Sequence, residues 1–537
     1  MTFHRLSKHL LLTFLLLAAL VITACDETAD DPLPTVVIPT REDGGTNETN
    51  NSDTPAETGD TSATAVPEGE TSAEANATPT LAPTEEPTLT PEPTVAPVTD
   101  LPIQQVTGNP LPAISRDLLF IGDGSFKQWN QRNGQIDILI AGPEPASRIS
   151  EDPDVTEFVG DITDFVLNRD GKRAVIARRT GTITLTETAL NENDVEETVE
   201  MTFPVHELLF MDLVSRDIWQ IVPQIANLQS MDLSPDAQQV AFVASNLNSE
   251  LSLTEEGIPP QQLFVLASGG GASPSEVRTV DSCLRSCSAP VWHIESNLVV
   301  WGDFEALKLF NIAGREAEPL LANQADMPDI AIHYPLEWAN NGRFLLLGIG
   351  RIEGGNKAVF DVPTGRVIEI PDSFVYIDPF PTEVSWMQDD RLFILRTGND
   401  TPTAELWRVN IDDGNIVKEE SLLLTNANAG AMGQMHLQDG RFAFALVNED
   451  PALSGIYHLT SLSQQPEKVN AIPAGDTDFP AELTLVRWSA DGFGAIVVHN
   501  GVTYYAPAEG NILYDMSAVF GANAHSFLWQ RDIIIVQ

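Results

Sequence analysis

The sequence of 537 residues is poor in basic side chains, with 29 Lys and Arg against 77 Asp and Glu. Its formal net charge of −48 repels phosphate backbones and anionic lipid headgroups, so the sequence argues against a nucleic-acid partner. The excess extends along the chain: residues 111–537 hold 60 acids and 26 bases, a balance of −34. Cations, basic proteins and neutral glycans remain possible partners, and solubility alone also accounts for the charge.

Long apolar runs are lacking except near the N-terminus. There, Arg5 and Lys8 precede the predominantly apolar run Leu10–Ile22. As a helix this run spans about 20 Å, less than the roughly 30 Å of a bilayer's hydrocarbon core. The pattern is typical of an export signal covering residues 1–24 rather than of a transmembrane anchor.

The residues that follow, Ile22-Thr23-Ala24-Cys25, resemble the lipobox of bacterial lipoproteins. The resemblance implies cleavage before Cys25 and a diacylglyceryl thioether on its sulfur. The protein would then be anchored to the cell membrane by lipid and face outside the cytoplasm, in an extracellular or periplasmic location. The alternative is a plain signal followed by a chance cysteine.

Aromatic residues are absent from residues 26–110, which contain 18 Thr and 13 Pro. A segment without aromatics buries too little apolar surface to offset the entropy of ordering. We therefore predict that residues 25–110 comprise the lipidated cysteine and a disordered stalk.

Cysteine is also scarce, and beyond Cys25 only Cys283 and Cys287 remain. An even number in an oxidising compartment favours a structural disulfide. The alternatives are a redox dithiol, which ordinarily has two intervening residues, or half of a metal site, which would need a second pair.

What the chain has in abundance is a repeat, which begins near residue 160. An apolar segment ends in a large residue, which we call the anchor, and an acid or Asn follows three positions later, often before Gly. The clearest copy is Trp488 with Asp491-Gly492. The eight anchors, spaced 41 to 66 residues apart, are Leu167, Leu233, Trp292, Trp338, Trp386, His436, Trp488 and Trp529.

Each copy predicts a β-hairpin, because Asp-Gly and Asn-Gly supply the positive φ values of tight turns. Two further strand patterns follow most hairpins, such as 262–266 and 276–280. Four strands per repeat, without helical periodicity after the signal, indicate the blades of a β-propeller. A β-sandwich could share the strand spacing, but it would not repeat the anchor in this way.

The segment Leu233-Ser-Pro-Asp236-Ala-Gln-Gln-Val-Ala-Phe242 is similar to the core repeat of TolB-type, WD-repeat-like propellers. That resemblance implies a propeller; the eight anchors favour eight blades, with seven as the alternative. Two copies depart from the pattern. Ala237 replaces the turn glycine, and we expect Glu295-Ser296 to break the turn of its repeat.

The two ends of the repeat region are incomplete, which predicts ring closure by both termini. Strand patterns without an anchor occur at 118–121, 126–129 and 136–140, whereas the Trp529 hairpin has nothing after it. Pairing them completes one blade and covers two exposed sheet edges. Residues 118–121 and 533–536 then compete for the same strand position in that blade, which leaves one strand pattern surplus. The predicted propeller domain covers residues 111–537.

Motifs for chemistry are missing from the sequence. The turn aspartates lie one per repeat and belong to no calcium loop, so we interpret them as turn residues. Seven histidines beyond the signal show no metal-ligand spacing, and Gly269-Gly270-Gly271 precedes no helix that could bind phosphate. Neither catalytic, cofactor-binding nor metal-binding residues are predicted, and no cofactor is expected.

The sequence therefore predicts a lipid-anchored binding or scaffold module for a protein or glycan ligand. One alternative is an extracytoplasmic propeller enzyme, such as a glycosidase or polysaccharide lyase, because about sixty acids could supply a carboxylate pair. Another is a factor resembling the BamB lipoprotein of envelope assembly. A fold of this kind does not discriminate between them.

Overall fold

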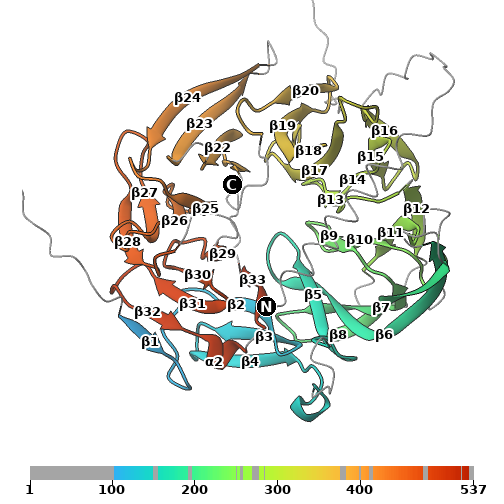
Figure 1. Ribbon diagram of the computed structural model, residues 1–537, viewed down its shortest axis with the longest axis horizontal. Coiled ribbons are helices and arrows are strands. Elements are labelled where there is room, and N and C mark those ends of the chain that lie inside the picture. Colours follow the sequence, from blue (N-terminus) through green and yellow to red (C-terminus); the bar gives the residue numbers. More distant parts are fainter. Residues whose placement is uncertain are drawn as a thin grey trace, which may run out of the picture. The chain divides into compact units, whose positions relative to one another are not determined.

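In the described part of the chain, eight sheets stand as blades of a ring around a common centre, which we call the channel (Figure 1). The predicted eight-bladed propeller is confirmed, and the seven-bladed alternative is wrong. The computed structural model describes residues 102–148, 155–190, 196–248, 251–253, 258–268, 277–283, 285–352, 354–374, 382–397, 401–410, 415–475, 482–521 and 523–530. Cys25, most of the predicted stalk, Gly269–Gly271 and residues 533–536 lie outside these ranges.

Each blade has four antiparallel strands, which run in order from the channel to the rim. Blade 1 is β33 (His525–Trp529), β2 (Leu118–Gly122), β3 (Ser125–Asn130) and β4 (Gln135–Ile140); blade 2 is β5 (Ile162–Leu167), β6 (Arg173–Leu190), β7 (Glu196–Asp212) and β8 (Ile218–Ala226). Blade 3 is β9 (Ser230–Leu233), β10 (Gln239–Ala244), β11 (Gln261–Ala267) and β12 (Arg278–Cys283); blade 4 is β13 (Val291–Trp292), β14 (Leu298–Gly302), β15 (Ala306–Asn311) and β16 (Ala317–Ala322). Blade 5 is β17 (Ile332–Trp338), β18 (Phe344–Arg351), β19 (Gly354–Asp361) and β20 (Arg366–Glu369); blade 6 is β21 (Glu383–Trp386), β22 (Arg391–Arg396), β23 (Thr403–Asn410) and β24 (Asn415–Leu423). Blade 7 is β25 (Gly430–His436), β26 (Phe442–Val447), β27 (Gly455–Leu459) and β28 (Glu467–Ala471); blade 8 is β29 (Leu483–Trp488), β30 (Gly494–His499), β31 (Val502–Pro507) and β32 (Leu513–Asp515).

Every predicted anchor is the last residue of an innermost strand. Three anchor indoles join their blade to the one before it. The Nε1–H groups of Trp292, Trp386 and Trp529 donate to backbone carbonyls of the preceding blade at 3.3, 3.2 and 2.9 Å. In each case the acceptor is the residue just before the preceding anchor, so the repeat places equivalent atoms together at successive blade interfaces.

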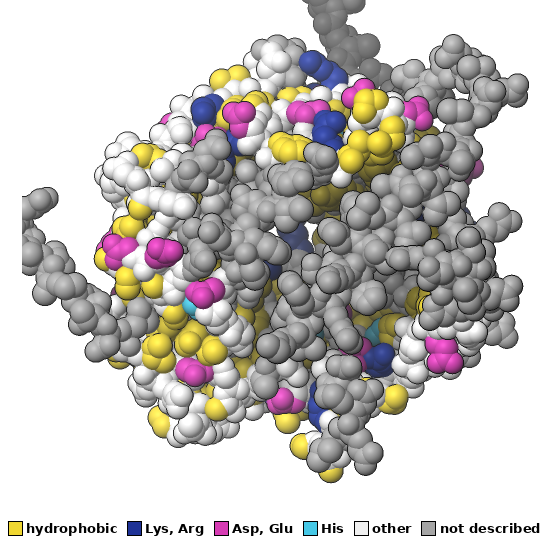
Figure 2. All heavy atoms as spheres, viewed as in Figure 1, with side chains coloured by type: hydrophobic (Ala, Val, Ile, Leu, Met, Phe, Trp, Pro, Cys, Tyr) yellow, Lys and Arg dark blue, Asp and Glu magenta, His cyan; other side chains and the backbone are white. Residues whose placement is uncertain are grey.

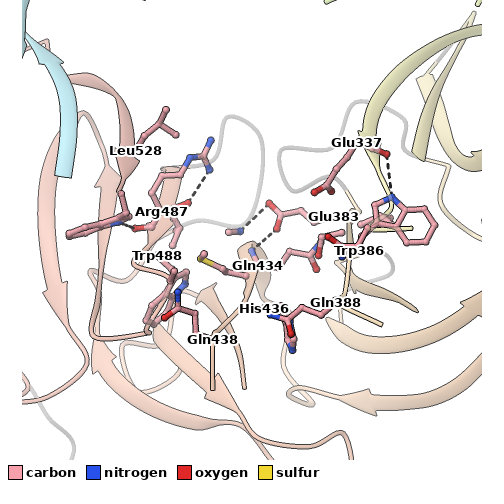
Figure 3. Close-up of a pocket in the computed structure, with 18 of the residues that line it drawn as sticks. Glu337, Glu383, Trp386, Gln388, Gln434, His436, Gln438, Arg487, Trp488 and Leu528 are labelled. Atoms are coloured by element: carbon pink, nitrogen blue, oxygen red, sulfur yellow. Dashed lines mark hydrogen bonds between the residues drawn. The ribbon is translucent and has the colours of Figure 1, made fainter. Parts of the chain in front are cut away.

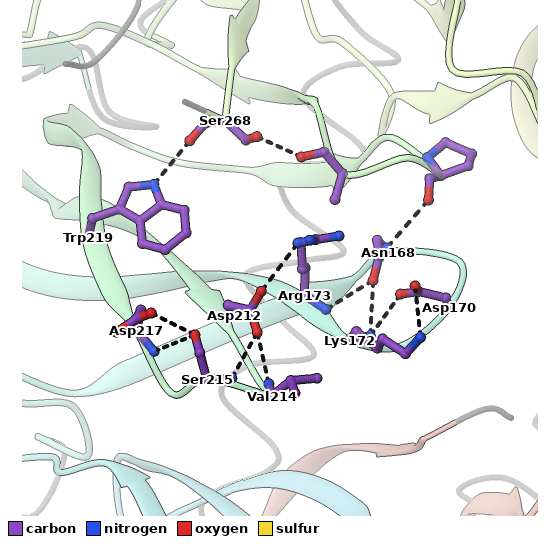
Figure 4. Close-up of polar contacts among 12 residues, drawn as sticks. Asn168, Asp170, Lys172, Arg173, Asp212, Val214, Ser215, Asp217, Trp219 and Ser268 are labelled. Carbon is purple, nitrogen blue, oxygen red and sulfur yellow. Dashed lines mark hydrogen bonds and ion pairs between the residues drawn. The ribbon is translucent and has the colours of Figure 1, made fainter. Parts of the chain in front are cut away.

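The interpretation of the acidic residues as turn formers is confirmed. In six hairpins the side-chain oxygen of the acid or Asn accepts the backbone N–H two residues later, as Asp170 does from Lys172 at 3.0 Å (Figure 4). This side chain fixes the turn locally by an Asx-type hydrogen bond. Such a role accounts for the carboxylate or amide in these six hairpins.

Ala237 and Ser296 keep the turn geometry, so the expectation that Glu295-Ser296 breaks its turn is wrong. Their φ angles are 60° and 61°, within the left-handed region that glycine occupies in four other copies and Asp390 occupies in blade 6. The backbone N–H of each closes its turn, to Ser234 O at 2.8 Å and to His293 O at 2.9 Å respectively. Closure of the hairpin compensates a strain of about 1–2 kcal/mol per non-glycine residue.

Two turn glycines allow a test of strain against packing. A Cβ added at Gly440 (φ 86°) meets no atom within 4 Å, whereas one added at Gly492 (φ 72°) meets Leu437 Cδ1 at 2.5 Å. We expect Gly440→Ala to lower the free energy of unfolding by about 1 kcal/mol, from backbone strain alone. Gly492→Ala should cost roughly 2–4 kcal/mol, because overpacking adds to the strain. Urea denaturation measures both, and equal losses would contradict the packing argument.

Ring closure is confirmed at blade 1. The C-terminal strand β33 pairs with the N-terminal strand β2, placing Leu118 opposite Trp529 and Leu119 opposite Leu528. Leu118–Gly122 therefore occupies the second strand position of blade 1, for which residues 118–121 and 533–536 were expected to compete. A second link between the chain ends was not predicted: β1 (Ile103–Gln105) adds to blade 8 as a fifth strand, parallel to β32. The prediction of a disordered stalk up to residue 110 is therefore wrong for Ile103–Gln105, because backbone pairing to β32 holds these residues in place.

Outside the strands, the main features of the described residues are two short helices and a disulfide. Helices η2 (Pro145–Arg148) and α2 (Ser517–Phe520) were not predicted, since one turn leaves no periodic pattern in a sequence. Cys283 is disulfide-bonded to Cys287, at the end of β12. Within the described ranges of the chain, every helix is too short to cross a bilayer.

Candidate functional site

A cavity of about 610 Å³ lies in the central channel (Figure 3). Its wall is built from the innermost strands of five consecutive blades, β17, β21, β25, β29 and β33. The volume falls within the range of about 300–1,000 Å³ that is usual for small-molecule sites. We take this channel pocket as the candidate functional site.

The residues that precede the anchors form the repeated part of the pocket wall. Five of the eight line the cavity, from blades 5, 6, 7, 8 and 1 in order: Glu337, Ser385, Met435, Arg487 and Leu528. The equivalents in blades 2, 3 and 4 are Val166, Asp232 and Val291. Sequence reasoning did not identify these positions, although the anchor frame locates them by a fixed offset of one residue.

Two charged side chains of the pocket are bonded within the protein. The Glu383 carboxylate accepts the backbone N–H groups of Gly433 at 3.0 Å and Gln434 at 2.7 Å, which joins blade 6 to blade 7. Lys357 Nζ donates to the carbonyl of Thr382 at 2.7 Å. Burial lowers the pKa of Lys357, while the nearby Glu383 carboxylate opposes that shift.

Two further charged side chains of the described pocket wall, one acidic and one basic, are exposed and lie on separate walls. Glu337 belongs to blade 5 and Arg487 to blade 8, and Figure 3 shows them on opposite sides of the cavity. Arg487 is oriented by its own neighbour, since its Nη1 donates to Val486 O at 3.1 Å. Burial lowers the pKa of His436, which also lines the pocket.

Carboxamide side chains supply further polar groups of the pocket: Asn340, Gln388, Gln434 and Gln438. Asn340 donates to Met387 O at 2.9 Å, and Gln438 accepts Arg116 Nη2 at 2.8 Å. The Oε1 atom of Gln434 is buried without a hydrogen-bond partner in the described part of the chain. It is an acceptor that a bound N–H or O–H group could satisfy.

Asp232 holds the equivalent position in blade 3. Its carboxylate accepts the backbone N–H groups of Leu233 at 2.9 Å and Trp292 at 3.2 Å. Burial nevertheless raises its pKa to about 7, although both hydrogen bonds favour the charged form. The ring of residues before the anchors therefore contains one acid that titrates near neutral pH.

A group with metal-like spacing lies elsewhere, where atoms of Asp281, Cys283 and Asp303 come within 4.8 Å of one another. Its chemistry does not suit a metal. The Cys283 sulfur is in the disulfide, and Lys308 Nζ donates to Asp281 at 2.9 Å and to Asp303 at 2.7 Å. The lysine supplies the positive charge that both carboxylates need.

Comparisons with known proteins add likeness of fold alone. No protein-family model and no curated protein matches the chain. Among solved structures, dipeptidyl peptidase 4 of Porphyromonas gingivalis is 11% identical with a TM-score of 0.45, over 76% of this chain and 61% of that one. The β-propeller domain of the Trilobed protease from Pyrococcus furiosus is 13% identical with a TM-score of 0.34, over 69% and 96% respectively.

The putative TolB of Agrobacterium tumefaciens is 13% identical with a TM-score of 0.29, over 57% of this chain and 90% of its own. The chain spans less than two thirds of the length of the peptidase. The neighbours include enzymes as well as TolB, so they assign no activity to this ring.

Proposed function

We propose that this protein is a lipid-anchored, extracytoplasmic binding or scaffold module that holds a protein or glycan ligand in its channel pocket. The observation that carries the proposal is the cavity of about 610 Å³, whose wall combines exposed charges, carboxamides and indoles. Apolar surface with a few convergent polar groups is the usual composition of a binding site.

The charge distribution supports a ligand without a large negative charge. Figure 2 shows Asp and Glu side chains spread over several blades of one face, and residues 111–537 carry a balance of −34. Within this acidic domain, the described residues that line the pocket include two acids and two bases. Anionic polymers are repelled at long range, whereas neutral and dipolar ligands are not.

Binding by the pocket is tested with the full-length protein in detergent, screened against peptide and neutral glycan arrays. We expect Glu337→Gln and Arg487→Gln each to weaken binding of the ligand about 10-fold or more, because a hydrogen bond to a charged group contributes about 1.5–3 kcal/mol. Glu318→Gln, at an exposed position on β16, is the matched control. Unchanged affinity in both pocket variants would place the site elsewhere, and polysaccharide cleavage lost in Glu337→Gln would favour an enzyme.

The anchor is tested separately. Cys25→Ser removes the sulfur that the thioether and the processing both require, so we expect an uncleaved or soluble species in place of the lipidated one. Phase partitioning in Triton X-114 and mass spectrometry of the N-terminus measure the two effects. Partitioning of the variant equal to that of the wild type would contradict the lipoprotein proposal.

A further inference from the structure

The position two residues after the anchor carries a carboxamide in three consecutive blades. These residues are Asn340 in blade 5, Gln388 in blade 6 and Gln438 in blade 7. All three are exposed and line the channel pocket, and Figure 3 labels Gln388 and Gln438 there. Each lies in the turn that follows an innermost strand, so the three form a row along the wall, which we call the carboxamide arc.

Contacts between successive turns hold the carboxamide arc in place. Asn340 Nδ2 donates to Met387 O at 2.9 Å, which joins the turns of blades 5 and 6. The backbone N–H of Gln438 donates to Ala490 O at 2.9 Å, which joins the turns of blades 7 and 8. Gln438 Oε1 also accepts Arg116 Nη2 at 2.8 Å, so this side chain is oriented. Groups fixed in this way lose little conformational entropy when a ligand binds.

Part of each carboxamide is available to a ligand. Among the described residues, Asn340 Oδ1, Gln438 Nε2 and both ends of the Gln388 side chain make no hydrogen bond within the protein. A carboxamide donates through its nitrogen and accepts through its oxygen, whereas a hydroxyl group does both through one atom. A hydroxyl group therefore pairs with either end of a carboxamide. Free donors and acceptors in one row match a molecule that is rich in hydroxyl groups.

The acids that follow the arc residues are paired within their own turns. Asp389 is bonded to Arg391 and Asp439 to Arg441, each at 2.7 Å. In blade 5 the corresponding residue is the neutral Asn341. The arc therefore presents dipoles rather than a net charge, and a ligand needs no charge of its own to bind there. A neutral ligand is also not repelled by the acidic domain.

We infer that the carboxamide arc binds a neutral oligosaccharide along the channel wall, with sugar hydroxyl groups at blades 5, 6 and 7. The inference rests on the proposed binding function and narrows its ligand to a glycan. Peptides are commonly bound by strand addition or by an apolar groove, and a row of side-chain amides supplies neither. A sugar chain repeats its hydroxyl groups along its length, as the arc repeats its carboxamides along the ring.

The experiment is isothermal titration of the full-length protein in a polyoxyethylene detergent, which carries no sugar. The probes are cello-, malto- and manno-oligosaccharides of one to six units, and alanine peptides of the same lengths with both ends blocked. We expect at least one oligosaccharide series to bind, with an affinity that rises until the chain spans the arc. The affinity should change less than about 2-fold between 0.05 and 0.5 M NaCl, because the arc has no net charge.

Two variants test the arc itself. Gln388→Met removes the carboxamide at similar size and breaks no hydrogen bond within the described protein. Gln438→Glu keeps an acceptor for Arg116 but loses the free donor. We expect each variant to weaken oligosaccharide binding about 5-fold or more, the usual effect of losing a neutral hydrogen bond. The matched control is Gln464→Met, at an exposed position between β27 and β28, and thermal melting checks that each variant folds.

The outcomes separate the ligand class from the binding function. Oligosaccharide binding that both arc variants leave unchanged, or that falls steeply with salt, would overturn the inference but leave the binding function standing. Binding of the blocked peptides alone, weakened by Gln388→Met, would assign the arc to peptides and would also overturn it. Failure of every oligosaccharide and peptide to bind would remove both the inference and the proposed function.

Discussion

Deletion of residues 524–537 is expected to unfold the propeller rather than merely shorten it. The deletion removes β33, and with it Phe527 and Trp529, which are 2% and 8% exposed. Loss of a large buried aromatic costs about 3–5 kcal/mol, and two such losses match the 5–15 kcal/mol stability of a typical domain. It also leaves β2 as an open edge facing the channel. We expect insoluble protein or a fall in Tm of more than 15 °C, measured by differential scanning calorimetry.

Two matched deletions separate closure from simple shortening. Removal of residues 531–537 retains β33, and removal of residues 1–105 takes away only the outer strand β1 of the described ring. Both should leave a cooperative melting transition. Trp529→Phe keeps most of the apolar volume but loses the hydrogen bond to Arg487 O, for a cost of about 1–2 kcal/mol. An unchanged Tm after deletion of 524–537 would reject closure by this strand.

Acid is expected to destabilise the ring through two buried histidines. His206 and His458 are 5% and 4% exposed, and burial together with a neighbouring arginine lowers the pKa of each to about 4. For His458 the neighbour is Arg441, whose Nη1 lies 2.7 Å from Nδ1, so protonation brings two cations together. A histidine with a lowered folded-state pKa stabilises the fold above about pH 6.5, and this contribution is lost as the pH falls towards 4.

The expected loss of unfolding free energy on acidification is up to about 3 kcal/mol for each histidine. It follows from a difference of about 2.5 between the pKa values of the unfolded and folded states. His206→Gln and His458→Gln remove one titration each. Their free energies of unfolding, measured from pH 7.5 to 4.5, should fall less steeply than that of the wild type by about 2–3 kcal/mol over this range. The general decrease in negative charge on acidification is common to all three proteins and cancels in the difference. Parallel curves would show that these imidazoles titrate normally.

The fold could be predicted because its signals are local. An anchor and the acid three residues later mark one hairpin, and both the innermost strand and its turn follow from that short segment. Even Ala237 and Ser296 adopt the glycine-like turn, because the backbone closure of the hairpin outweighs the preference of the residue. Strand β1 could not be predicted, since Ile103–Gln105 is exposed and is held by backbone pairing to β32 instead of by a burial pattern.

The channel pocket was not predicted for a different reason. Its wall combines residues about fifty positions apart, and the position before the anchor carries Glu, Ser, Met, Arg and Leu in successive blades. Position in the ring, rather than residue type, makes these side chains neighbours. The absence of a recognisable motif in the sequence is consistent with a site assembled from one residue per repeat.

The outer strand β1 determines where mechanical load enters the domain. All of the chain before Ile103 is connected to the ring through β1, which is paired with β32 over three residue pairs. We therefore expect a force on that chain to act first on this short parallel pair of strands, on the rim of blade 8. The pairing of β33 with β2 in blade 1 would not carry the force at that stage. Release of β1 would free about 10 Å of chain, at roughly 3.3 Å per residue, and leave the β33–β2 pairing in place. If the chain before Ile103 is the proposed tether, we expect β1 to detach under load before the β33–β2 pairing opens.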